Sequence, residues 1–135
     1  MDLPTRVDGF PALQGARVLV LEDEFLILTE LESGLADAGA EVVGPCRNAR
    51  DALAALDQHA VTAAILDLQL RGGRSSVQVG RELARRGIPF LFYSGQLDTT
   101  PIRAEWPGCR IISKPAPLRM IMTAIAQLLG KQPGK

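Results

Sequence analysis

The sequence lacks an excess of charge of either sign. It has 15 Lys and Arg residues against 15 Asp and Glu residues, so its formal net charge at pH 7 is zero. Nucleic-acid binding depends largely on basic side chains, and this balance gives no indication of such a partner. The longest apolar runs are far shorter than the ~20 residues of a membrane-spanning helix, and the N-terminus has charges and prolines where a signal peptide is apolar. We therefore expect a cytoplasmic protein with no membrane partner.

Cysteine and histidine are also scarce. Cys46 and Cys109 have no spacing typical of a metal site, and cytoplasmic proteins rarely form disulfides, so we interpret both as small buried hydrophobic residues. His59 is the only histidine, so Ser–His or Cys–His catalysis would have to depend on it. Its place at the expected end of a helix is explained by a favourable contact with the helix dipole.

The chain is long enough for one domain with a substantial core. It has 135 residues, of which 47% are hydrophobic. Residues 1–15 have prolines and glycines without periodicity and are predicted to form a flexible leader. Within it, Phe10 and Leu13 are candidates to pack on the domain. Residues 16–130 form the predicted domain, and residues 131–135 a short polar tail.

Buried strands and amphipathic helices alternate along this domain. The strands are expected at residues 17–21, 41–46, 61–67, 89–93 and 109–112, with helices after each. One of these helices, at about 100–105, is kept short by Pro101 and Pro107. The pattern predicts an α/β, flavodoxin-like fold: a five-stranded parallel sheet in the order 2-1-3-4-5 with helices on both faces. Cys46 and Cys109 then lie at opposite edges and cannot pair.

Polar residues follow four of these strands. Glu22 and Asp23 follow the first, Asp67 the third, Ser94 the fourth and Lys114 the fifth. The carboxyl ends of parallel strands share one rim, so these five residues are expected to meet there. Because three close carboxylates repel one another, the rim makes physical sense with a bound cation, and oxygen ligands without histidine or thiol favour Mg²⁺ or Mn²⁺.

Such a rim is suited to forming an acyl phosphate. The cation and Lys114 would offset the charge of a transferred phosphoryl group, and Ser94 could donate a hydrogen bond to it. Taken singly, each residue has a simpler interpretation: Asp67 and Ser94 as turn residues, and Lys114 as a surface residue. Their joint position at the ends of successive strands favours the functional interpretation.

The motifs around these residues resemble the receiver domain of two-component response regulators. They are VLVLEDE with Glu22, ILDLQL with Asp67, FYSG with Ser94 and SKP with Lys114, and the resemblance covers about residues 16–130. It implies that Asp67 accepts a phosphoryl group from a histidine kinase or a histidine phosphotransfer protein.

The same resemblance implies a magnesium site and a loop geometry. Asp23, Asp67 and the main-chain carbonyl of Gln69 would bind Mg²⁺, with Glu22 acting through water. It also implies a cis bond between Lys114 and Pro115. The protein would then be a phosphoacceptor and not an enzyme, and it would signal through an unidentified output protein or act as a phosphate sink.

Two features depart from the family pattern or refine it. Receivers usually have Tyr or Phe three positions before the lysine as a switch, and here that position is Ile111. Together with the stretch PFLFYSG, this resembles a sub-group of stand-alone receivers paired with kinases of the HWE type. Gln69 and Gln96, two residues beyond Asp67 and Ser94, are predicted to flank the phosphoryl group and affect its lifetime.

Two other functions remain open from the sequence. A pseudo-receiver that only docks partners is suggested by Ile111 and by Glu22 in place of the commoner aspartate. A metal-dependent phosphohydrolase with Asp67 as nucleophile would use the same carboxylates, although the sequence has no second aspartate two residues after Asp67.

Overall fold

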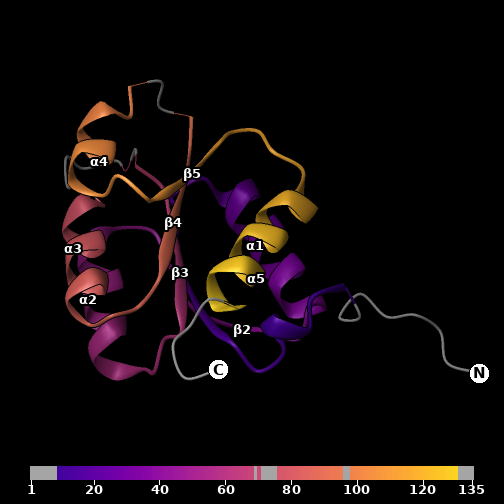
Figure 1. The fold of residues 1–135 in the computed structure, drawn as a ribbon. Helices are drawn as coiled ribbons and strands as arrows, with labels where there is room; N and C mark the ends of the chain where they lie inside the picture. Colours follow the sequence, from indigo (N-terminus) through magenta and orange to yellow (C-terminus); the bar gives the residue numbers. More distant parts are fainter. Residues whose placement is uncertain (1–8, 69, 71–75, 96–97, 131–135) are drawn as a thin grey trace, which may run out of the picture.

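The protein folds around a five-stranded parallel sheet (Figure 1). The structure is a computed structural model and describes residues 9–68, 70, 76–95 and 98–130. The strand order is β2-β1-β3-β4-β5, as predicted from the alternation of elements. The strands are β1 (Arg17–Leu21), β2 (Glu41–Cys46), β3 (Ala63–Leu66), β4 (Phe90–Ser94) and β5 (Arg110–Ser113). This flavodoxin-like order puts a topological switch point between β1 and β3, where such folds bind ligands.

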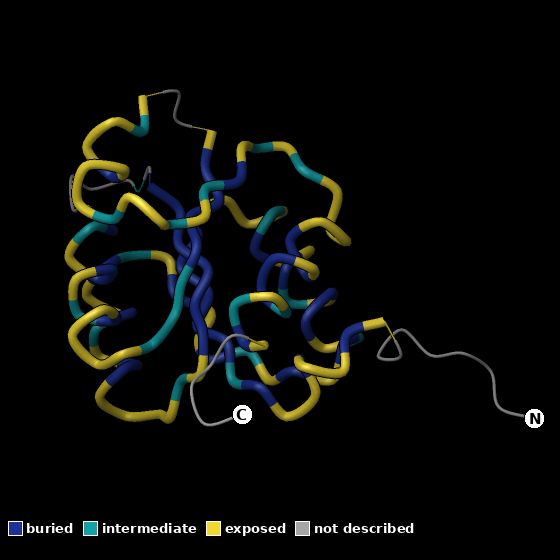
Figure 2. Tube along the Cα trace, in the orientation of Figure 1, coloured by how far each residue is buried: buried dark blue, intermediate teal, exposed yellow. Residues whose placement is uncertain are grey.

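Helices cover both faces of the sheet. Figure 1 shows α1 (Phe25–Asp37) and α5 (Leu118–Gly130) on one face, and α2 (Ala49–Gln58), α3 (Val77–Arg85) and α4 (Thr100–Glu105) on the other. Each helix layer forms its own hydrophobic core with the sheet. The three central strands, β1, β3 and β4, are buried along most of their length (Figure 2), which explains their nearly continuous apolar sequences.

Local sequence features fix where the helices begin and end. The Asn48 side chain accepts a hydrogen bond from the main-chain N–H of Asp51 at 2.8 Å and so caps α2. After α1 the chain turns through Gly39, whose φ of +88° favours glycine, and the N–H of Ala40 donates to the carbonyl of Leu35 at 2.9 Å. This bond closes the C-terminus of α1.

Part of the N-terminal segment packs on the domain. A short 3₁₀ helix, η2 (Pro11–Leu13), lies against α5, and the side chain of Leu13 is completely buried. The Arg119 guanidinium lies 5.2 Å from the ring centroid of Phe10. Phe10 and Leu13 thus dock on the domain, as the sequence suggested. Residues 1–8 and 131–135 lie outside the described part of the chain.

The α3–α4 side differs in one detail from the prediction. The helical spacing of Val79, Leu83 and Ala84 predicts that all three face inward, but Ala84 is exposed. Gly80 lies in the interface instead, because a Cβ atom there would be only 3.1 Å from Cη2 of Trp106. The six-residue α4 has the predicted bounds and is held by the buried Ile102.

The two cysteines lie far apart on the sheet. Cys46 is in the edge strand β2, Cys109 precedes the opposite edge strand β5, and both are free. This arrangement confirms that they cannot form a disulfide with each other. Within the described ranges, no helix combines the length and apolarity needed to cross a membrane.

Candidate phosphorylation site

Main-chain pairing aligns the ends of the strands that carry the predicted site. Leu21 of β1 is paired with Leu66 of β3, so Glu22 and Asp67 leave the sheet side by side. The N–H of Asp67 donates to the carbonyl of Leu21 at 3.0 Å, and the N–H of Lys114 donates to the carbonyl of Ser94 at 3.0 Å. The register of the sheet therefore brings together residues that are up to 92 positions apart in the sequence.

Lys114 lies at the centre of the site. Its Nζ atom is 3.0 Å from Oε1 of Glu22, 3.0 Å from Oδ2 of Asp67 and 3.2 Å from Oε2 of Glu24. Glu22 and Asp67 are almost inaccessible to solvent, at 1% and 2% exposure, whereas the Glu24 side chain is 57% exposed. One ammonium group thus bridges two buried carboxylates and one solvated carboxylate.

The electrostatics of this group are unusual. Burial and, to a smaller extent, the nearby Asp67 charge outweigh the hydrogen bond from Lys114 and raise the pKa of Glu22 from 4.5 to about 7. Burial by itself would lower the pKa of Lys114, but its hydrogen bonds to Glu22 and Asp67 raise that pKa above its ordinary value. The lysine therefore stays charged, while Glu22 is poised to gain or lose a proton near neutral pH.

The same carboxylates could hold a cation. Oxygen atoms of Glu22, Glu24 and Asp67 all lie within 4.8 Å of one another, the one such acidic group found among the described residues. Only oxygen ligands are present, which fits Mg²⁺ or Mn²⁺. The sequence analysis missed Glu24, because its proximity depends on a turn in which its N–H donates to Oε2 of Glu22 at 3.1 Å.

Asp23 has a different setting from these three carboxylates. It is half-buried beside the site, and its main-chain carbonyl accepts a hydrogen bond from the Arg47 guanidinium at 2.9 Å. Its role as a metal ligand stays a prediction. Gln69 and Gln96, predicted to affect phosphate lifetime, lie outside the described residues, as does the expected carbonyl ligand of Gln69.

The remaining predicted positions are all described. Ser94 ends β4 and is 2% exposed, and Ile111 is half-buried in the core on the side of α3 and α4. The Lys114–Pro115 peptide bond is cis, as the resemblance implied.

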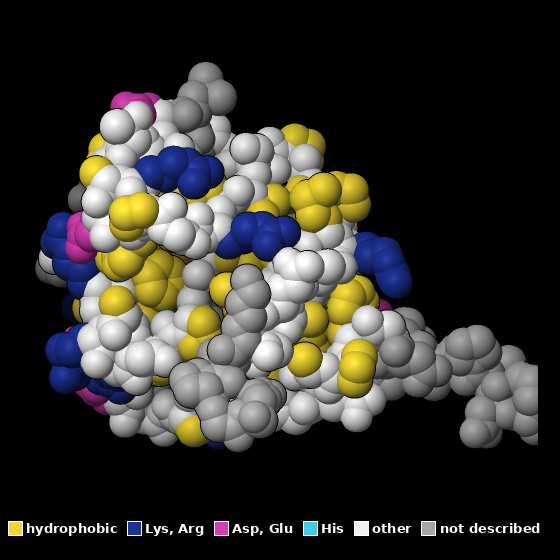
Figure 3. Space-filling view, in the orientation of Figure 1, with side chains coloured by type: hydrophobic (Ala, Val, Ile, Leu, Met, Phe, Trp, Pro, Cys, Tyr) yellow, Lys and Arg dark blue, Asp and Glu magenta, His cyan; other side chains and the backbone are white. Residues whose placement is uncertain are grey.

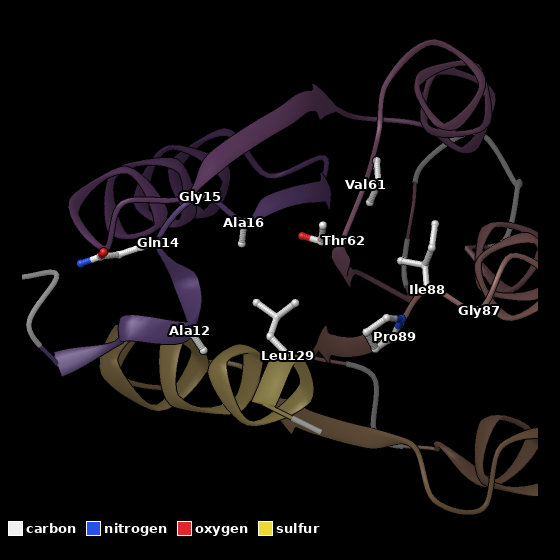
Figure 4. Close-up of a pocket in the computed structure, with 10 residues that line it drawn as sticks. All are labelled: Ala12, Gln14, Gly15, Ala16, Val61, Thr62, Gly87, Ile88, Pro89 and Leu129. Carbon is white, nitrogen blue, oxygen red and sulfur yellow. The ribbon is translucent and has the colours of Figure 1, made fainter. Parts of the chain in front are cut away.

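Two hollows of about 420 Å³ each lie away from this rim. Figure 4 shows the first, at the opposite end of the sheet, where Ala16, Thr62 and Pro89 come directly before their strands. Its one hydroxyl, that of Thr62, is already bonded to the main chain of Arg17. The second is lined by Phe90 and Trp106 below α4, where Figure 3 shows apolar side chains. Its polar lining groups are already engaged or unreactive: the Glu105 carboxylate is paired with Arg81 at 2.8 Å, and burial raises the pKa of the Cys109 thiol to about 11.

Comparisons with known proteins agree with this geometry. No family model and no curated protein matches the chain. Among solved structures, a response regulator receiver protein from Sinorhizobium medicae WSM419 is 26% identical, with a TM-score of 0.77 and coverage of 88% of this chain and 98% of that one. SdrG from Sphingomonas melonis Fr1 is 34% identical, with a TM-score of 0.72 and coverage of 87% and 98%.

Two further similarities extend this result. The BeF3-activated conformation of SdrG from Pseudomonas melonis Fr1 is 35% identical to this chain, with a TM-score of 0.69. The match covers 84% of this chain and 95% of that one. The response regulator PhyR from Brucella abortus is 29% identical, with a TM-score of 0.73; the match covers 91% of this chain but only 51% of PhyR. The chain belongs to the response regulator receiver family.

Proposed function

We propose that this protein is a response regulator that accepts a phosphoryl group on Asp67 from a histidine kinase or a histidine phosphotransfer protein. The observation that carries the proposal is the buried Asp67 carboxylate at the carboxyl end of β3, 3.0 Å from the Lys114 ammonium. In the transfer, a carboxylate oxygen of Asp67 forms a bond to phosphorus, and the phosphorus–nitrogen bond of the donor phosphohistidine breaks. The donor imidazole nitrogen keeps the bonding electron pair. Because the other ring nitrogen is protonated, the leaving group is neutral imidazole.

The residues around Asp67 are suited to stabilise this step. Lys114 is close enough to offset negative charge on the phosphoryl oxygens, and Ser94 is the proposed hydroxyl donor to one of them. Asp23, Asp67 and the Gln69 carbonyl are the proposed Mg²⁺ ligands, with Glu22 acting through water. The cation, when bound, would offset negative charge on the phosphoryl group.

We also propose that the phosphorylated protein signals by contact with another protein, which binds at α4 and responds to its conformation. Ile111 replaces the usual aromatic switch, so the signal must pass through other contacts of this face. The short α4 is held by the buried Ile102 and by the adjoining Trp106, whose ring lies 5.4 Å from that of Phe90. It also has a solvent-accessible ion pair, in which the Arg81 guanidinium donates to Glu105 at 2.8 Å, and such pairs stabilise a fold only slightly. Reordering costs least in such an element. Beryllium fluoride with Mg²⁺, which mimics the phosphoryl group, should therefore change amide exchange in α4; identical exchange with and without it contradicts this output.

The phosphoacceptor is tested by treating the protein with phosphoramidate and Mg²⁺ and measuring its intact mass. We expect one added phosphoryl group in the wild-type protein and none in Asp67→Asn. Glu41→Gln is a matched control, because Glu41 is an exposed carboxylate at the opposite end of the sheet, paired with Arg17 at 3.4 Å. This variant should be phosphorylated like the wild-type protein.

The remaining outcomes separate the other functions. A folded wild-type protein that gains no phosphoryl group from phosphoramidate or from any histidine kinase of its source would be a docking module independent of phosphorylation. Repeated release of phosphate from small phosphate esters, lost in Asp67→Asn, would show a phosphohydrolase. Transfer from one kinase in strong preference to the others would identify the partner and test its assignment to the HWE type.

A further inference from the structure

The single tyrosine of the chain lies directly beside the proposed site. Tyr93 is in β4, one residue before Ser94, and is only 4% exposed. Its ring packs in the core between the sheet and helices α1 and α5, together with Leu91 and Ile112. Its hydroxyl accepts a hydrogen bond from the main-chain N–H of Ala116 at 3.2 Å.

Tyr93 and its neighbour hold the segment around Lys114 at two points. Ala116 comes two residues after Lys114, in the connection between β5 and α5. On the other side, the N–H of Lys114 itself donates to the carbonyl of Ser94 at 3.0 Å. The end of β4 thus supplies one hydrogen bond to Lys114 and one to the residue two positions later.

The tyrosine ring also lies near the end of the lysine side chain. Nζ of Lys114 is 5.7 Å from the ring centroid of Tyr93, within the ~6 Å at which an ammonium group is attracted to an aromatic ring. Lysine has a long flexible side chain, and holding it in one conformation has an entropic cost. A ring fixed in the core restricts the positions that Nζ can adopt beside Asp67.

We propose that Tyr93 is a positioning residue for Lys114 in phosphoryl transfer, an inference that rests on the proposed function. The hydroxyl fixes the main chain beyond Lys114, and the ring restricts its ammonium group near Asp67. Tyr93 does not stand in for the absent aromatic switch at Ile111. Ile111 packs on the side of α3 and α4, whereas Tyr93 packs on the side of α1 and α5.

The alternative is a tyrosine that only fills the core and satisfies its own hydroxyl. Both interpretations predict some loss of stability on substitution, so stability cannot separate them. A positioning role also predicts that binding of a phosphoryl mimic weakens and that the Lys114 side chain becomes less fixed. A control that loses a similar hydrogen bond elsewhere must leave both properties unchanged.

The experiment compares wild type, Tyr93→Phe, Tyr93→Leu and Thr62→Val by NMR. Tyr93→Phe removes the hydroxyl and keeps the ring, and Tyr93→Leu removes both. Thr62 accepts a hydrogen bond from the N–H of Arg17 at 2.9 Å at the far end of the sheet, so Thr62→Val is the matched control. Each protein is titrated with beryllium fluoride at fixed Mg²⁺ while amide signals are followed, and the Ala116 amide and Lys114 Cε–H signals are first recorded without it.

We expect Tyr93→Phe to weaken beryllium fluoride binding about three- to tenfold, the effect of one net hydrogen bond. Tyr93→Leu should weaken it more, because the ring contact is also lost. In both variants the Ala116 amide proton should move upfield and the Lys114 Cε–H signals should move toward those of a solvated lysine. Thr62→Val should match the wild type in all three measurements.

Several results would overturn the inference. They are unchanged binding in Tyr93→Phe, an unmoved Ala116 amide, or an equal loss of binding in Thr62→Val. If the wild-type protein itself does not respond to beryllium fluoride, the proposed function fails. The Lys114 Cε–H signals then decide separately whether Tyr93 positions the lysine: a shift in Tyr93→Phe but not in Thr62→Val supports it, and any other pattern refutes it.

Discussion

The protonation of Glu22 should make the stability of the metal-free protein depend on pH. Burial raises the pKa of this carboxyl from 4.5 to about 7 in the folded protein, whereas the unfolded chain leaves it exposed to water. A carboxyl with a raised pKa holds its proton more tightly in the folded state. As the pH rises above 4.5, the unfolded chain loses this proton first, so the free energy of unfolding falls until the pH exceeds about 7.

The size of this effect follows from the two pKa values. One pKa unit corresponds to about 1.4 kcal/mol, so Glu22 should lower the free energy of unfolding by about 2.5 kcal/mol between about pH 5 and about pH 8. Other groups titrate over the same range, and Glu22→Gln isolates the contribution of Glu22. Glutamine keeps the size of the side chain and an oxygen that can accept from Lys114, but it does not titrate.

The assay is urea unfolding of both proteins with a chelator present, at several pH values. We expect the wild type to lose about 2.5 kcal/mol relative to Glu22→Gln across this range. Added Mg²⁺ should reduce the loss in the wild type, because cation binding favours the ionised carboxylate. Parallel stability curves for the two proteins without metal would refute the conclusion that burial keeps Glu22 protonated below neutral pH.

Substitutions at three further positions test the packing that supports the site. Leu13→Ala should lower the free energy of unfolding by about 2–5 kcal/mol in urea titrations, because this side chain is completely buried; a change near zero would show that the N-terminal segment is loose in solution. Asn48→Ala should cost about 1 kcal/mol by removing the cap of α2, and Asn48→Asp should restore most of it. Gly80→Ala should alter the fluorescence of Trp106, the only tryptophan, since the new Cβ lies 3.1 Å from its ring; an unchanged spectrum would contradict this contact.

The fold could be predicted because its main determinants repeat along the chain. Short apolar runs alternate with amphipathic segments, and parallel strands with helical connections allow few arrangements. The same rule places the carboxyl ends of the strands on one rim, and for this reason Glu22, Asp67 and Lys114 were expected to meet. Their contacts in the structure follow from the sheet register, which the buried strands specify strongly.

The details that escaped prediction depend on irregular backbone. Glu24 joins the acidic group because the chain turns between β1 and α1, and no periodicity in the sequence encodes that turn. The docking of Phe10 and Leu13 likewise depends on tertiary contacts with α5, including Arg119 above the Phe10 ring. The bond from Ala116 to Tyr93 requires the conformation of the loop after Lys114, which residue types alone do not specify.

The proposed phosphoryl group has two contacts, Lys114 and Ser94, which are connected to opposite sides of the sheet. Side chains alternate along β4, so Tyr93 faces α1 and α5, while Ser94 lies at a position facing the side of α3 and α4. Lys114 is the fixed contact of the two. The Tyr93 hydroxyl holds the main chain at Ala116, and the N–H of Lys114 itself donates to the Ser94 carbonyl. A phosphoryl group that draws Ser94 toward Asp67 would then act mainly on the α4 side. Without an aromatic residue at Ile111 to follow that movement, we expect the change to reach α4 along the chain from Ser94 and through the other contacts of this face.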